Sequence, residues 1–242
     1  MILRQFLHTD PVAASYLLGC GGKPAGAVVD PVGDIAPYLA AAEATGMRIL
    51  HVIDTHLHAD HISTGRALAE AAGAQYVLHA GAAVAYAFKC VQDGDVLKLG
   101  NVAIRVMHTP ERISLVVTDR TRSEDPWFIL TVHTLMVGDL GRTELATSAE
   151  AGARDLFQSV QALKALPDWL EVLLGACSGS VCGRSLSGKP TSTIGYENRH
   201  NRAFWVEDEA AFVQMMVADI PPPPPGAAQT RAMNAGQLAA AE

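Results

Sequence analysis

The segment Thr55–His61, with the sequence THLHADH, constrains the fold of this chain most strongly, because it gathers four potential metal ligands within seven residues. The preceding residues 48–54 (RILHVID) are rich in β-branched side chains and predict a strand, and residues 63–73 (STGRALAEAAG) begin with a Ser/Thr cap and predict a helix. The cluster therefore lies in a strand-to-helix loop, where a rigid base can turn several side chains inward. Imidazole and carboxylate groups at this spacing suit zinc or iron. The candidate ligands of this loop are His56, His58, Asp60 and His61.

Length and composition favour one globular domain. The chain has 242 residues, 49% of them hydrophobic and 18% charged, which is enough apolar material for a substantial core. We expect a single domain over residues 1–220, followed by a tail, residues 221–242, that begins with five prolines and is typical of polyproline II structure. The net charge of −7 argues against non-specific binding of nucleic acid, which needs a basic face.

Membrane and disulfide signals are weak in this sequence. No apolar run approaches the roughly 18 residues that a membrane-spanning helix needs, and the first residues lack the apolar run of a secretory signal. The four cysteines form no CxxC pair, and we expect them to be small buried residues in a reducing compartment. These observations predict a cytoplasmic protein that does not bind membranes.

Alternation and helical spacing predict the remaining elements. Residues 96–109 alternate around Gly100-Asn101 and predict a hairpin, and residues 113–120 and 127–137 predict a second one. Helices are expected over residues 34–46, 148–169 and, as the last element, 207–220. The Gly/Ser-rich segment 177–201 is expected to be a long functional loop.

Several motifs together carry a family resemblance. The THLHADH motif resembles the HxHxDH signature of the metallo-β-lactamase fold, and the stretches AVVDPV, VGDLGR and CGRSLSGKPTSTIGYENRHN resemble its persulfide dioxygenase branch, close kin of the glyoxalase II thioesterases. The resemblance implies an α/β fold, an αββα four-layer sandwich with the site at the strand ends between two sheets. It also implies that one iron(II) oxidises a glutathione persulfide with O₂ in the dioxygenases, whereas two metals share a bridging Asp in the hydrolases.

The sequence departs from the family pattern at three ligand positions. The stretch MHTPERISLVV has no Gly-His, so either the turn histidine has gone and Arg112 sits nearby, or His108 takes its place. We favour His108, because the downstream residues stay in phase with it. His133 stands where the pattern has the metal-binding Asp, with Val132 where it has a Gly, and Ala176 stands where it has a His.

These departures argue against a two-metal site. Two divalent ions about 3.5–4 Å apart repel each other by about 17–19 kcal/mol at an effective dielectric constant of about 20. A neutral imidazole at position 133 cannot bridge them as a carboxylate does, and Ala176 removes a ligand. A single metal is expected instead, held by His56 with His108 and His133, or by a set that includes His58. Fe(II) is the first expectation, and Zn(II), which accepts three His ligands and water, is its competitor.

The resemblance also implies a substrate. Arg142 in GDLGR and Lys189 in SGKPTSTIG fall where the dioxygenase relatives place cationic contacts to the glutathione carboxylates. The first hypothesis is therefore oxidation of a glutathione-type persulfide at one metal, with no further catalytic residue assigned. The alternatives are a catalytically degenerate relative that binds a thiol or a protein partner, and a mononuclear zinc hydrolase of thioesters or lactones. Members of this fold often pair through exposed faces, so a homodimer is a further expectation.

Overall fold

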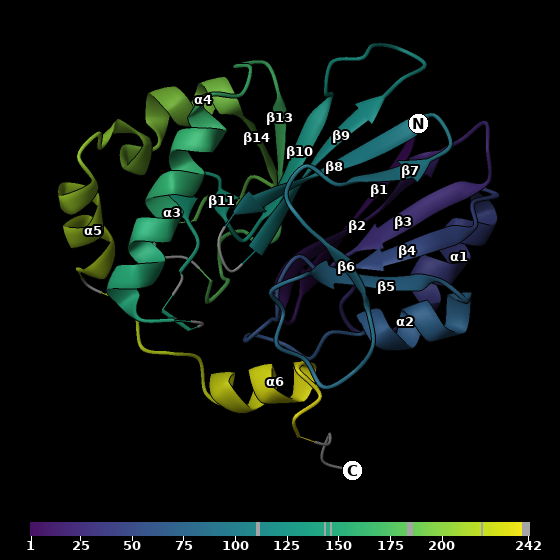
Figure 1. Cartoon of the computed structure of the whole chain (residues 1–242), viewed down its shortest axis with the longest axis horizontal. Coiled ribbons are helices and arrows are strands. Elements are labelled where there is room, and N and C mark those ends of the chain that lie inside the picture. The colour runs from purple at the N-terminus through teal and green to yellow at the C-terminus, as the bar shows by residue number, and fades with distance from the viewer. Residues whose placement is uncertain (110–111, 143, 146, 183–185, 219, 239–242) are drawn as a thin grey trace.

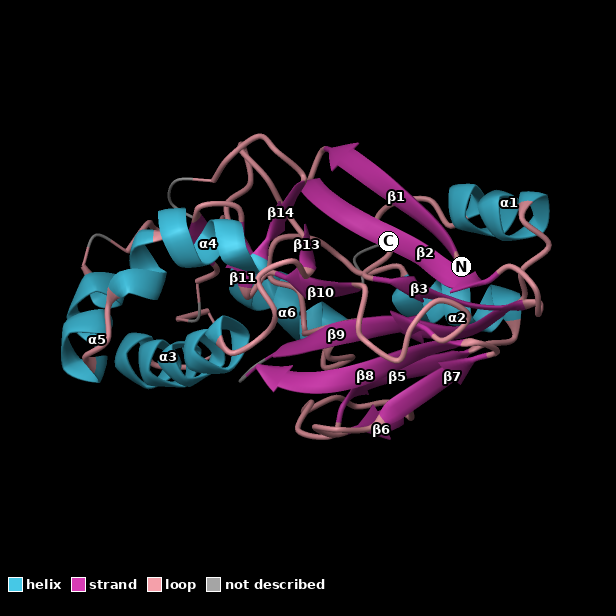
Figure 2. Cartoon of the chain, turned by 90° about the horizontal axis from the view of Figure 1, so that it is seen from above, coloured by secondary structure: helices cyan, strands magenta, loops and turns pink. Residues whose placement is uncertain are grey.

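The computed structural model describes residues 1–109, 112–142, 144–145, 147–182, 186–218 and 220–238. Two six-stranded sheets pack face to face, and helices cover their outer faces (Figures 1 and 2). This arrangement confirms the predicted αββα sandwich. Among the described residues, no helix is long and apolar enough to cross a membrane.

The first sheet delivers the THLHADH loop. Its strands follow chain order: β1 (Ile2–Thr9), β2 (Val12–Cys20), β3 (Ala25–Val29), β4 (Ile49–Ile53), β5 (Gln75–His79) and β6 (Lys89–Val91). The strands β1 to β3 are antiparallel, and β3 to β6 are parallel. The parallel pairs need crossovers, which α1 (Ala36–Ala44) and α2 (Gly65–Ala72) provide on the outer face of the sheet. The loop follows β4 and therefore lies at the carboxyl edge of the parallel strands.

The second sheet contains both predicted hairpins. Its order is β14 (Thr191–Thr193), β13 (Glu171–Leu174), β10 (Phe128–Val132), β9 (Arg112–Asp119), β8 (Val102–Thr109) and β7 (Val96–Leu99). The β7–β8 turn pairs Leu99 with Val102, and Gly100 adopts the positive φ of 64° that this tight turn requires. The outer face carries α3 (Ala149–Lys164), α4 (Ile194–His200), a 3₁₀ turn (Arg202–Trp205) and α5 (Glu209–Val217). A small pair, β11 (Leu135–Met136) and β12 (Asp139–Leu140), follows β10.

Cap residues explain where several helices begin. Ser148 and Asp208 accept hydrogen bonds from backbone N–H groups at the starts of α3 and α5. Asp34, the first residue of the helix expected over 34–46, accepts one from Ala36 N at 3.0 Å, although α1 itself starts after Ile35. The main core lies between the sheets, where inward-facing residues such as Leu18, Ile53, Leu115 and Leu130 are fully buried. Burial on both faces explains why these strands are almost continuously apolar.

Two segments differ from the expectation. The segment 177–201, expected to be a loop, ends in β14 and α4, whose N-cap Thr193 accepts from Tyr196 N at 3.1 Å. The helix over 209–217 is not the last one, because the tail contains α6 (Ala227–Asn234) after the proline tract. In Figure 1, α6 lies below both sheets rather than in either helical layer. Gly226, with φ of 73°, ends the extended segment and lets the helix begin.

Candidate metal centre

The end of β3 fixes the THLHADH loop. Asp30 directly follows β3, and its buried carboxylate accepts hydrogen bonds from Thr55 N at 2.7 Å, Thr55 Oγ1 at 2.8 Å and His58 Nε2 at 3.2 Å. Asp30 has a φ of 45°, a left-handed conformation that Asp tolerates better than most residues. A carboxylate that holds one ring nitrogen of a histidine leaves the other nitrogen directed at a metal. Asp30 therefore orients His58.

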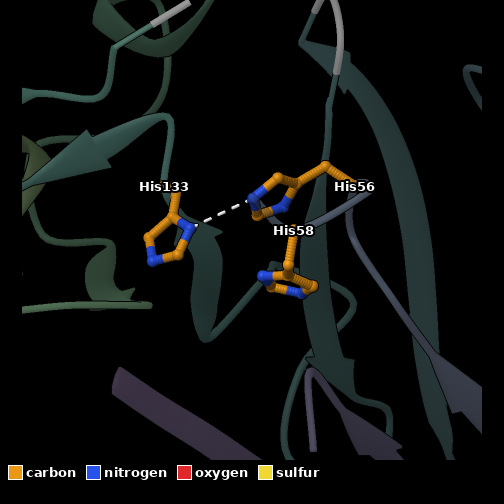
Figure 3. A group of neighbouring side chains, drawn as sticks. All are labelled: His56, His58 and His133. Atoms are coloured by element: carbon orange, nitrogen blue, oxygen red, sulfur yellow. Dashed lines mark hydrogen bonds between the residues drawn. The ribbon is translucent and has the colours of Figure 1, made fainter. Parts of the chain in front are cut away.

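The end of β10 brings His133 to the same place. Val132 has a φ of 45°, a strained conformation for a β-branched residue, at the point where the pairing with β13 shifts register. The chain turns there, and His133 Nδ1 comes within 3.1 Å of His56 Nε2 (Figure 3). Two nitrogen ligands about 2.0–2.1 Å from a tetrahedral zinc lie about 3.3–3.4 Å apart. The spacing of these two rings thus matches a shared metal ion.

Three histidines converge in this way. One ligand atom from each of His56, His58 and His133 lies within 4.8 Å of the other two, and Figure 3 shows the rings around one space. The same criterion groups His58 with Asp60 and His61. Asp60 lies 3.1 Å from His61 Nδ1 and 3.8 Å from His58 Nδ1.

Several ring nitrogens of this cluster are buried without a hydrogen-bond partner. They are His58 Nδ1, His61 Nε2 and His133 Nε2, whereas His61 Nδ1 lies against the Asp60 carboxylate. A buried polar atom left in this state costs about 1–3 kcal/mol, and native structures contain few of them. A metal ion would satisfy such nitrogens, so the donor set fits the metal that the motif implies.

The charges of the cluster also suit a metal. Burial lowers the pKa of His133 to about 4, and burial followed by the nearby His58 holds the pKa of His56 well below its ordinary value. Both rings are therefore neutral near pH 7, as ligands must be. Burial alone would lower the pKa of His58, but the Asp30 and Asp60 carboxylates outweigh it and raise that pKa. Burial opposes the ionisation of Asp60 in turn, yet its contacts with His58 and His61 keep its pKa below the ordinary value.

The structure does not bring His108, the preferred candidate for the third ligand, into this cluster. His108 is exposed and stacks on His79, with ring centroids 4.2 Å apart and planes at 7°. By strand alternation His108 shares the inner face of β8 with Ile104 and Val106, and there its ring stacks on His79 of the other sheet instead of reaching His56. Arg112, the residue named in the other alternative, lines the cavity beside His56 and His133.

The two predicted substrate cations lie in different surroundings. Arg142 lines the cavity, but its guanidinium pairs with Glu144 at 2.5 Å and donates to the carbonyls of Pro221, at 2.7 Å, and Pro222, at 3.3 Å. Lys189 is exposed and is absent from the lining of this cavity. The cavity measures about 30 Å³, and it lies beside an open groove of about 740 Å³ that shares His56, Leu57 and Arg231 with it.

Sequence reasoning missed two residues of this site. Cys182 lines the cavity, although the cysteines were expected only to be small buried residues, and Asn234 of α6 donates to the carbonyls of His58 and His61, both at 2.9 Å. Asn234 also accepts from Ser63 N at 2.9 Å. The position of Cys182 in the polar segment 177–201 was the available signal for the first, and no local pattern marks the second.

Comparisons with known proteins agree with this geometry. The family model of the metallo-β-lactamase superfamily matches residues 9–110. A solved metallo-β-lactamase from Staphylococcus aureus subsp. aureus COL is 33% identical, superimposes with a TM-score of 0.91, and is matched over 97% of this chain and 72% of its own.

Two curated relatives are similar at lower coverage. The mitochondrial persulfide dioxygenase ETHE1 of Homo sapiens is 30% identical over 177 residues, which is 66% of this chain and 61% of the relative. A hydroxyacylglutathione hydrolase of Rhodospirillum rubrum is 30% identical over 164 residues, 66% of this chain and 60% of the relative. The matches thus span about three fifths of the length of these relatives. The chain belongs to the metallo-β-lactamase superfamily, and the curated relatives that it is similar to include a persulfide dioxygenase and a hydroxyacylglutathione hydrolase.

Proposed function

We propose that this protein is a divergent persulfide-dioxygenase-like metalloprotein that binds one divalent metal ion and, with it, oxidises a glutathione-type persulfide with O₂. The observation that carries the proposal is the convergence of His56, His58 and His133 on one space, with buried ring nitrogens that lack hydrogen-bond partners. The similarity to a persulfide dioxygenase supports the choice of substrate class. Iron(II) is the proposed ion, since it supplies the open positions at which a persulfide and O₂ react.

The residues of the chain have separate roles in this proposal. His133 and the histidines of the loop hold the ion, while Asp30 keeps His58 in orientation through its hydrogen bond. The groove beside His56 has room for the peptide part of a thiol, which the small cavity does not. Arg142 is proposed to bind a substrate carboxylate, which would replace the carbonyls of Pro221 and Pro222 as the hydrogen-bond acceptor of its guanidinium. Lys189 is proposed as a more distant cationic contact.

A mononuclear zinc hydrolase is the second candidate. It is favoured by the three-histidine set His56, His58 and His133, because three His ligands and a water suit zinc, and by the similarity to a hydroxyacylglutathione hydrolase. The third candidate, a relative that only binds a thiol, is favoured by the engagement of Arg142 within the protein.

Metal analysis and oxygen uptake separate these functions. Protein grown with iron and zinc should contain close to one metal per chain, and His133→Ala should lose it. The variant His108→Ala is the matched control and should keep its metal, because this exposed histidine lies outside the cluster. Less than about 0.1 metal per chain in the wild type would exclude both enzymes.

The reaction is tested on the loaded protein. Iron protein should consume O₂ when glutathione persulfide is added, and His56→Ala should not. Equal rates in the two proteins would remove the dioxygenase proposal. If zinc predominates and a glutathione thioester is cleaved instead, the hydrolase takes its place.

A further inference from the structure

Cys182, the first residue of the stretch CGRSLSGKPTSTIGYENRHN, stands at the metal centre although it was not among the ligands expected from the sequence. Its sulfur, a carboxylate oxygen of Asp60 and a ring nitrogen of His133 all lie within 4.8 Å of one another. The side chain is only 9% exposed and lines the same cavity as His56, Asp60 and His133. Three distant segments thus bring a thiol, a carboxylate and an imidazole to one point.

The distances within this group can be compared with the geometry of a single ion. His133 is buried, at 2% exposed, and one of its ring nitrogens belongs to the group. Zinc–sulfur distances are about 2.3 Å, and zinc–nitrogen and zinc–oxygen distances about 2.0–2.2 Å, so ligand atoms of one ion lie at most about 4.5 Å apart. The three atoms therefore need only small side-chain movements to reach a common ion.

Charge balance favours a sulfur ligand here. A divalent ion held by three neutral imidazoles would keep its full charge in a buried place whose lining also includes Arg112, whereas the charge of Arg142 is already balanced by Glu144. Burying an uncompensated charge is costly. The carboxylate of Asp60 and the thiolate of Cys182 together would neutralise the ion. They would supply the negative charge that the Asp of the family pattern provides at the position of His133.

We propose that Cys182 binds the metal ion of this site through its sulfur, together with Asp60 and His133. The S–H bond breaks as the sulfur–metal bond forms, the proton passes to solvent, and no electron is transferred. The inference rests on the metal site of the proposed function but not on its reaction. Because thiolate is a soft ligand, it raises the affinity of the site for zinc relative to a set of oxygen and nitrogen ligands.

Cobalt(II) reports sulfur ligation directly. The metal-free full-length protein is titrated with cobalt(II), and the spectrum is compared for the wild type, Cys182→Ser and Cys177→Ser. Cys177 is the matched control, because it lies on the same segment and belongs to none of the ligand groups found among the described residues. The wild type and Cys177→Ser should show a near-ultraviolet thiolate-to-cobalt charge-transfer band. Cys182→Ser should lack it and bind cobalt at least about 10-fold more weakly.

The outcomes separate this inference from the proposed function. Visible cobalt absorption in the wild type without the sulfur band overturns the role of Cys182 and leaves the metal site intact. Absence of any cobalt binding overturns both. A sulfur band in protein whose iron form consumes no O₂ with glutathione persulfide supports Cys182 as a ligand and refutes the dioxygenase. The wild-type spectrum decides the matter even if Cys182→Ser fails to fold.

Discussion

Asn234 of the C-terminal helix holds the metal-binding loop, and its removal is the most informative perturbation of this fold. Its amide donates to the carbonyls of His58 and His61 and accepts from Ser63 N, all at 2.9 Å. The residue is 8% exposed, so water does not readily replace these contacts. At about 0.5–1.5 kcal/mol for each of the three hydrogen bonds, Asn234→Ala should lower the free energy of unfolding by about 1.5–4.5 kcal/mol.

The assay is urea denaturation of the metal-free protein, followed by metal binding. We expect a lower midpoint in urea and, because the loop loses its support, an affinity for cobalt or zinc weakened about 10–100-fold. Gln237→Ala is the control, since its exposed side chain lies three residues further along. If Asn234→Ala unfolds within about 0.5 kcal/mol of the wild type and binds metal equally well, α6 does not support the loop and the reasoning is refuted.

Three further predictions concern the ligands and their surroundings. Asp30→Asn removes the charged partner of His58 and should weaken metal binding about 10–100-fold in a chelator competition. An unchanged dissociation constant for the metal would contradict the orienting role of Asp30. Zinc at about 100 times its dissociation constant should stabilise the wild type by about 2.7 kcal/mol in thermal melts and leave His133→Ala unaffected; an equal shift in both would count against His133 as a ligand. Acidification should destabilise the metal-free protein between about pH 6.5 and pH 4, because His51 and His133 have a folded-state pKa of about 4 and bind protons more readily when unfolded. Stability that stays level over this range, measured by urea denaturation, would contradict those depressed pKa values.

Local sequence patterns were sufficient for much of the fold. The alternation around Gly100-Asn101 and the spacing of Leu156, Val160 and Leu163 predicted a hairpin and a helix, because both depend on contacts between near neighbours in the chain. The helix α6 was missed because five prolines precede it and its own sequence has little amphipathic pattern. Its position depends on contacts with residues far away in the chain, such as that between Tyr86 and the backbone of Asn234 at 2.6 Å.

The sequence by itself determined the architecture and the presence of a ligand cluster, since a strand, a loop of histidines and a helix must follow one another whatever surrounds them. The tertiary structure alone decided which residues complete the cluster. His108 stacks on His79 instead of joining the cluster, and the left-handed turn at Val132 brought His133 in. The approach of the segment after β13 placed Cys182 beside Asp60. Each of these outcomes depends on a side-chain direction or a long-range contact, which residue order alone does not encode locally.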